Sequence, residues 1–152
     1  MMKTLTFLQP WATLVALEAK RIETRSWRTT YRGPLTIHAS KGMPKAAISL
    51  CWDVPFRTAL EAGGYRAGNS PATNPFGLPL GAVIAVVELI DVYYITLENR
   101  PVEPEYSFGD YTPGRFAWVL RDVCRLPNPE PAKGRLGLWE WTSLIVPVDT
   151  GV

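Results

Sequence analysis

The residues best suited to chemistry lie between positions 18 and 41, where basic, acidic and aromatic side chains alternate. Lys20, Glu23 and Arg25 stand at the junction of an expected helix and an expected strand. Alternate side chains of a strand point the same way, so Glu23 and Arg25 are expected on one face. A carboxylate beside two cations can orient them to grip an anion or a base edge. The structural alternative is a lysine that satisfies helix carbonyls beside an ion pair at a strand edge.

The charge of the chain is unevenly distributed, and this bears on its partners. Residues 1–60 hold nine Lys or Arg against three acids, a balance of +6, whereas residues 61–152 hold seven against eleven, a balance of −4. Clustered cations with interleaved aromatic rings suit phosphate neutralisation and base stacking, and Trp27, Arg28, Tyr31 and Lys41 would extend such a surface. A solvated basic face without a ligand is the alternative.

Two further polar features interrupt apolar strands. Glu88 is the single acid within "AVIAVVELI", and a carboxylate there is costly unless it is paired, reaches solvent or faces a polar pocket. Thr36, His38 and Ser40 share one face of another strand and are followed by Lys41. A lone histidine in this setting is either a hydrogen-bonded structural residue or part of a site.

One loop also combines aromatic and acidic side chains. The segment 106–111 carries Tyr106, Asp110 and Tyr111. It is expected to be either a lid that stacks on a ligand or a packed surface loop.

The elements that must position these residues follow from periodicity and from proline and glycine. Helices are expected at 10–20 and from 44, with an interruption at Pro55 and an end at the paired glycines 63 and 64. Strands are expected at 5–9, 21–27, 35–40, 81–95, 115–126 and 136–141, with a proline-rich connection at 127–134. The pattern predicts an α+β fold in a single domain 1–152, a small and mostly antiparallel barrel with two or three short helices.

Several classes of function are disfavoured. No phosphate-binding Gly-x-x-x-x-Gly-Lys loop and no dinucleotide-binding glycine motif is present. Cys51 and Cys124 stand far apart, and His38 is the single histidine, so a disulfide framework, a zinc site and a histidine-dependent triad are poorly supported. No metal or cofactor is expected. Short apolar runs predict a cytoplasmic protein without a membrane partner.

Three stretches taken together resemble the ASCH domain family: "LTFLQPWATLVALEAKRIETRSWRTTYRGPLTIHASKG", "PLGAVIAVVELIDV" and "FAWVLRDVCRLPNPEPAKGRLGLWEW". They span most of the chain. The most specific part is a Gly-x-Lys-x-x-Glu-x-Arg motif, matched by Ala19, Lys20, Glu23 and Arg25, with alanine in place of glycine. Family members resemble PUA domains, small barrels with a cleft that is proposed to bind RNA or other nucleic acid. The resemblance implies that the motif lines such a cleft.

The resemblance also implies possible chemistry. One bacterial branch resembles an amidohydrolase that removes the acetyl group from acetylated cytidine through a lysine, a threonine and a glutamate, and ribonuclease activity has been proposed for another. Lys20 matches the lysine. The threonine position falls on Glu23, with Thr24 beside it and expected on the opposite face, and Glu88 is a candidate for the glutamate.

The main hypothesis is a domain that binds RNA, single-stranded nucleic acid or a modified nucleoside in a basic cleft. Its expected binding residues are Lys20, Glu23, Arg25, Trp27, Arg28, Tyr31, His38, Ser40 and Lys41. The alternative is a hydrolase, an amidohydrolase or ribonuclease, that uses the same cleft with Lys20, Glu23 and Glu88 as catalytic residues. A protein-interaction module is the third hypothesis, and the sequence predicts no oligomeric state.

Overall fold

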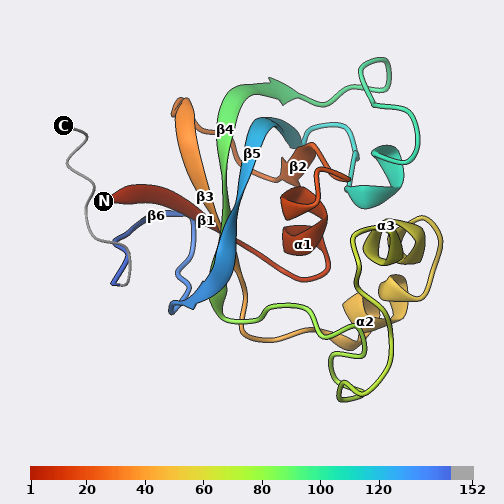
Figure 1. Ribbon diagram of the computed structural model, residues 1–152. Helices are drawn as coiled ribbons and strands as arrows, with labels where there is room; N and C mark the ends of the chain where they lie inside the picture. The colour runs from red at the N-terminus through yellow and green to blue at the C-terminus, as the bar shows by residue number, and fades with distance from the viewer. Residues whose placement is uncertain (145–152) are drawn as a thin grey trace.

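The computed structural model of the protein describes residues 1–144; residues 145–152, the end of the predicted domain 1–152, lie outside the described residues. The fold is α+β, as predicted, with one six-stranded sheet and three short helices (Figure 1). The strands are β1 (Met2–Phe7), β2 (Ile22–Arg25), β3 (Gly33–Ala39), β4 (Ala82–Tyr94), β5 (Phe116–Pro131) and β6 (Leu138–Trp141). The helices are α1 (Trp11–Ala16), α2 (Lys45–Cys51) and α3 (Phe56–Ala62), and a 3-10 turn, η1 (Tyr106–Phe108), interrupts the long loop before β5.

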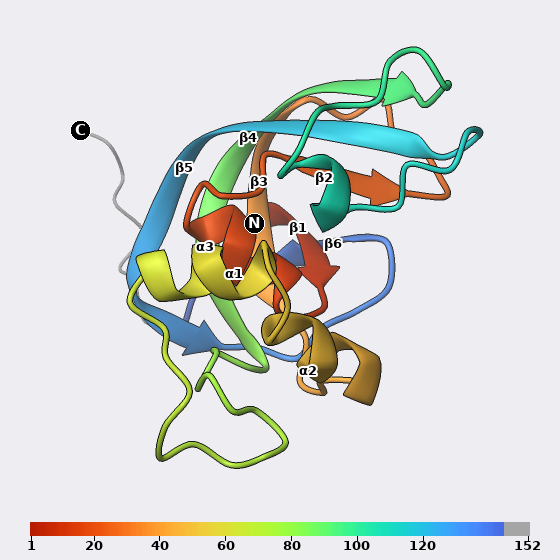
Figure 2. The ribbon, with the colours of Figure 1, turned by 90° about the vertical axis from the view of Figure 1, so that its right-hand side faces the viewer.

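The sheet is mixed but mostly antiparallel. Its strand order is β2-β5-β4-β3-β1-β6, and β1 with β3 is the parallel pair. Strands β4 and β5 are long and strongly bent (Figure 2). Within residues 1–144, β2 and β6 are the two edge strands and are not hydrogen-bonded to each other. The sheet is therefore curved and mostly antiparallel, as expected for a barrel, but the closure of a barrel is not shown.

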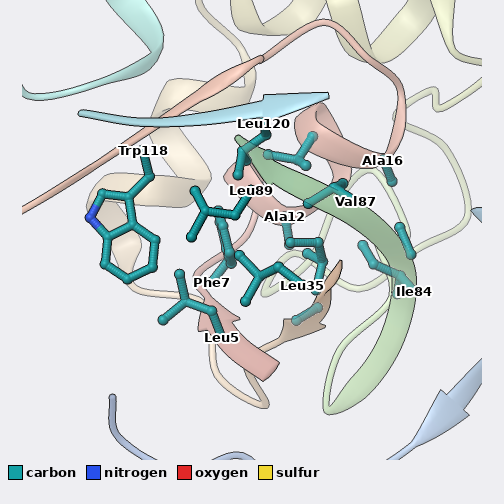
Figure 3. Packing of buried hydrophobic residues seen from close by; sticks show 14 residues of the cluster. Leu5, Phe7, Ala12, Ala16, Leu35, Ile84, Val87, Leu89, Trp118 and Leu120 are labelled. Atoms are coloured by element: carbon teal, nitrogen blue, oxygen red, sulfur yellow. The ribbon is translucent and has the colours of Figure 1, made fainter. Parts of the chain in front are cut away.

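The helices cover one side of the sheet (Figures 1 and 2). The main core forms where α1 meets the sheet, and the side chains converge there as Figure 3 shows. Strand β4 supplies Ala85, Val87 and Leu89 to this core, while Val83 packs in a separate cluster with Trp139 and Trp141 of β6. Because β4 contributes side chains to two buried apolar clusters, few of its positions face solvent, which explains its nearly continuous apolar run. No helix among residues 1–144 is long and apolar enough to cross a membrane.

Helix α1 ends four residues earlier than the predicted helix 10–20. Glu18 has a φ of 63°, in the left-handed region, and the amides of Ala19 and Lys20 both donate to the Leu14 carbonyl at 3.0 Å. This tight reversal is a helix stop that favours glycine. It also corrects the motif assignment, because the Gly-x-Lys spacing places the glycine position two residues before Lys20, at Glu18 rather than at Ala19.

Strand β5 runs further than predicted, through most of the proline-rich connection 127–134. Ala85 of β4 pairs with Arg125, but Val83 pairs with Glu130, so residues 126–129 bulge out of the ladder. Prolines have no backbone N–H to donate, and a bulge accommodates them without breaking the sheet. The bend carries the chain around to the loop that precedes β6.

Replacing Glu18 with glycine should relieve the left-handed strain and raise the free energy of unfolding by about 0.5 to 1 kcal/mol, measured by urea denaturation. Glu18 is exposed and makes no side-chain hydrogen bond with the described residues, so little else is lost. The matched control is Ala19→Gly, which has an ordinary φ and should not stabilise the protein. Equal effects of the two substitutions would contradict a strained Glu18.

Candidate functional site

Lys20 is buried two residues before β2, with 1% of its surface exposed. Its Nζ donates to the carbonyls of Ile22, at 2.5 Å, and Phe108, at 2.9 Å, and lies 3.5 Å from Glu23 Oε1. The ammonium thus has two hydrogen-bonded carbonyls and one paired carboxylate around it. Burial lowers the pKa of Lys20, and the nearby carboxylates of Glu23 and Glu105 oppose that shift. Lys20 therefore ties β2 to η1 and to a carboxylate inside the protein.

Glu23 is the hub of this polar group. Its Oε1 faces Lys20 and accepts the Thr24 amide at 3.2 Å, while its Oε2 accepts Arg25 Nε at 3.0 Å and lies 2.9 Å from Arg25 Nη2. The predicted common orientation of Glu23 and Arg25 is confirmed. Two hydrogen bonds and two ion-pair contacts therefore hold the carboxylate in place.

Arg25 is held from three directions and still faces outward. Besides Glu23, its Nη2 donates to the Thr6 carbonyl at 2.8 Å, and its guanidinium lies 5.3 Å from the centre of the Phe7 ring. Its Nη1 makes no hydrogen bond to any residue in the range 1–144, and 23% of the side chain is exposed. The result is a rigid guanidinium with one free edge.

Two cavities meet at Arg25, and both are also lined by Thr6 and Leu8. We call the pair the Arg25 cleft. The first cavity has a volume of about 480 Å³. Its other lining residues are Trp11, Glu23, Thr24, Leu50, Phe56, Ser107, Phe108, Gly109, Asp110 and Arg115.

The second cavity has a volume of about 410 Å³. Its other lining residues are His38, Ser40, Lys41, Lys133, Gly134, Arg135, Leu136 and Gly137. The first cavity thus has aromatic rings and carboxylates, whereas the second has cations and, among its lining residues within 1–144, no acid.

His38 forms part of the floor of the second cavity. Its Nε2 lies 2.7 Å from the Ala132 carbonyl and must donate to it, which leaves Nδ1 as an acceptor, 3.2 Å from the Thr6 hydroxyl. Its ring packs edge-on against Trp139, with centroids 5.5 Å apart. Burial lowers the pKa of His38, so the ring is neutral near pH 7.

The structure brings some of the predicted site residues together. Glu23 and Arg25 line the first cavity, and Arg25, His38, Ser40 and Lys41 line the second. Lys20 lies behind them and lines neither cavity. Thr24, expected on the opposite face from Glu23, also lines the first cavity.

Four other predicted residues lie outside the Arg25 cleft. Trp27 packs edge-on against Trp118, with centroids 4.8 Å apart, and the Tyr31 hydroxyl donates to the Pro34 carbonyl. Arg28 borders a separate hollow with Tyr94 and Phe116. Glu88 stands in the middle of β4, and its register partners are Pro34 and Arg121. A binding or catalytic role for these four residues stays a prediction.

Several cleft residues were not singled out from the sequence. Trp11 and Phe56 belong to apolar stripes that look like ordinary core, and Lys133 and Arg135 stand in an aperiodic connection. The segment 106–111 was singled out from its aromatic and acidic side chains. It contributes four lining residues to the first cavity: Ser107, Phe108, Gly109 and Asp110. Within residues 1–144, no group of three or more His, Cys, Asp or Glu is placed to hold a metal ion.

Comparison with known proteins gives one family and two curated relatives. The family description "ASCH domain" matches residues 5–129. Activating signal cointegrator 1 of Mus musculus is 26% identical over 143 residues, which cover 93% of this chain and 22% of that protein. The Homo sapiens protein of the same name is 26% identical over 139 residues, 90% of this chain and 22% of its own length. The chain thus spans about a fifth of the relatives' length.

Replacing Lys20 with methionine should lower the free energy of unfolding by about 3 to 5 kcal/mol, because Glu23 and two carbonyls lose a buried cationic partner. Urea denaturation at neutral pH measures the loss. The control is Lys3→Met, which breaks an exposed ion pair with Glu140 at 2.7 Å and should change stability little. Similar small effects of both substitutions would contradict a structural role for Lys20.

Replacing His38 with glutamine should alter how stability depends on pH. Because burial lowers the pKa of His38 below its ordinary 6.5, the unfolded chain binds the proton more readily than the folded protein. The wild type should therefore lose stability relative to His38→Gln as the pH falls through the window below about 6.5. Paired urea denaturation series at several pH values measure the difference, and a difference that does not change with pH would contradict a buried neutral ring.

Proposed function

The chain belongs to the ASCH domain family, whose PUA-like fold is often linked to RNA binding, and on that premise we propose that the Arg25 cleft binds single-stranded RNA or a nucleotide. The observation that carries the proposal is the guanidinium of Arg25, fixed by Glu23, the Thr6 carbonyl and the Phe7 ring. A planar cation with a free edge suits a phosphate or the edge of a base. Because it is already ordered, it loses little conformational freedom when a ligand binds.

The first cavity suits a base. Trp11 is the partly exposed ring of its lining, and the nearly fully buried rings of Phe56 and Phe108 pack edge-on behind it, with successive centroids 6.1 and 5.1 Å apart. Stacking on an aromatic ring such as that of Trp11 stabilises a base of any identity by about 1 to 3 kcal/mol. The volume also falls within the range of about 300 to 1,000 Å³ that is usual for small-molecule pockets. Asp110 and Arg115 supply polar groups at the wall.

The arrangement supports binding over hydrolysis. Hydrolysis of an amide or phosphodiester needs a base or nucleophile within hydrogen-bond reach of the ligand. Lys20 donates to two carbonyls, is paired with Glu23 and lines neither cavity, and both oxygens of Glu23 already have partners within the protein. Glu88 lies outside the lining of both cavities. Among the three residues that the hydrolase hypothesis names, none therefore both lines the cleft and lacks a partner within the protein.

The protein-interaction hypothesis rests on the six tryptophans and the acidic carboxyl-terminal half of the sequence, and the relatives add only their name. Their name describes a cointegrator, but this chain corresponds to 22% of each of those proteins.

Replacing Arg25 with lysine should weaken binding of short homopolymeric RNAs by about tenfold or more, because lysine keeps the charge but loses the planar fork. Fluorescence anisotropy measures the affinity, and the wild-type affinity should fall with salt at a log–log slope of about −0.7 per neutralised phosphate. The control is Arg28→Lys, in the separate hollow, which should bind like the wild type. Normal binding by Arg25→Lys with a loss in Arg28→Lys would place the RNA outside the Arg25 cleft.

A further inference from the structure

We propose that the second cavity of the Arg25 cleft is a phosphate subsite, so that the preferred ligand unit is a phosphorylated nucleotide and not a free nucleoside. The inference rests on the proposed function and gives it a substrate class. Four cations line this cavity, and they come from three separate parts of the chain: Arg25 from β2, Lys41 from the turn after β3, and Lys133 with Arg135 from the loop between β5 and β6.

Three of the four cations of this cavity are not compensated by the protein, whereas the fourth, Arg25, is paired with Glu23. Lys41, Lys133 and Arg135 form no ion pair with any residue in the described part of the chain, and none of the lining residues is acidic. The first cavity differs, since Asp110 there lies 3.5 Å from Arg115. Like charges gathered around one hollow repel one another, and an anion bound between them removes that repulsion. The chemistry of the second cavity therefore fits a phosphate.

The loop that carries two of these cations is held by the buried His38 and the partly buried Thr6. His38 Nε2 donates to the Ala132 carbonyl at 2.7 Å, and Thr6 Oγ1 lies 3.3 Å from the Arg135 carbonyl. Gly134 lies directly over the His38 ring, where an added Cβ would come within 2.7 Å of Cε1. Lys133 and Arg135 thus flank a glycine that is pressed onto the floor of the cavity, and their backbone positions are set before any ligand arrives.

The source of the positive charge can also be assigned. His38 is neutral, with its Nε2 proton donated to a carbonyl, so it supports the loop without contributing charge. The phosphate ligands are then lysine and arginine side chains, which stay protonated far above neutral pH. Arg25 belongs to both cavities, so a nucleotide whose base occupies the first cavity can place its phosphate in the second.

The test measures binding of the four ribonucleosides, their 5′-monophosphates and 3′-monophosphates, and pyrophosphate by isothermal titration calorimetry. The wild type should bind monophosphates at least about tenfold more tightly than the matching nucleosides, as expected for charge-assisted hydrogen bonds. The double variant Lys133→Ala/Arg135→Ala should lose this preference and keep the nucleoside affinity. The control Lys45→Ala/Arg66→Ala removes the same charge from exposed positions outside both cavities and should retain the preference.

The outcomes separate the two proposals. Nucleosides bound as tightly as monophosphates, or a preference that survives in the double variant, would overturn the phosphate subsite and leave the proposed function standing. Pyrophosphate binding that depends on Lys133 and Arg135, without any nucleoside or nucleotide binding, would support the subsite and overturn the proposed function. No binding of any of these compounds would overturn both.

Discussion

The burial of a single lysine ammonium constrains the whole site. A cation removed from water is stable only when its donors are satisfied, and Lys20 meets this condition with two carbonyls and one carboxylate. The Phe108 carbonyl fixes the η1 loop against β2, and the carboxylate of Glu23 is turned toward Arg25. The three charged residues therefore differ in what they do, since Lys20 anchors the loop, Glu23 orients Arg25, and Arg25 faces the cleft.

The sequence predicted those features that depend on local pattern. Strand alternation placed Glu23 and Arg25 on one face, and the mixture of elements indicated an α+β fold with a mostly antiparallel sheet. The sequence could not show that Lys20 is buried. The burial depends on the left-handed turn at Glu18 and on the carbonyl of Phe108, which stands far along the chain. The bulge in β5 was also not predicted. A proline-rich segment has the composition of a connection whether or not the residues on either side of it pair with a neighbouring strand.

The distribution of charge along the chain is a poor guide to its distribution in space. The amino-terminal part is basic and the remainder is acidic, yet two of the four cations in the second cavity come from the acidic part. Folding brings Lys133 and Arg135 beside Lys41 and Arg25 because the bent β5 returns the chain to the edge where β1 and β3 end. Within one cleft this produces an aromatic cavity and a basic cavity, the two surfaces that a nucleotide requires.

A crystal structure with a bound nucleoside 5′-monophosphate would decide whether the Arg25 cleft is the ligand site. We expect the base against Trp11 in the first cavity, and the phosphate within hydrogen-bond distance of Lys133 or Arg135 in the second. Arg25 Nη1 should contact the ligand between them. A nucleotide that occupies the hollow beside Arg28 and Tyr94, with the Arg25 cleft filled by solvent alone, would contradict this placement.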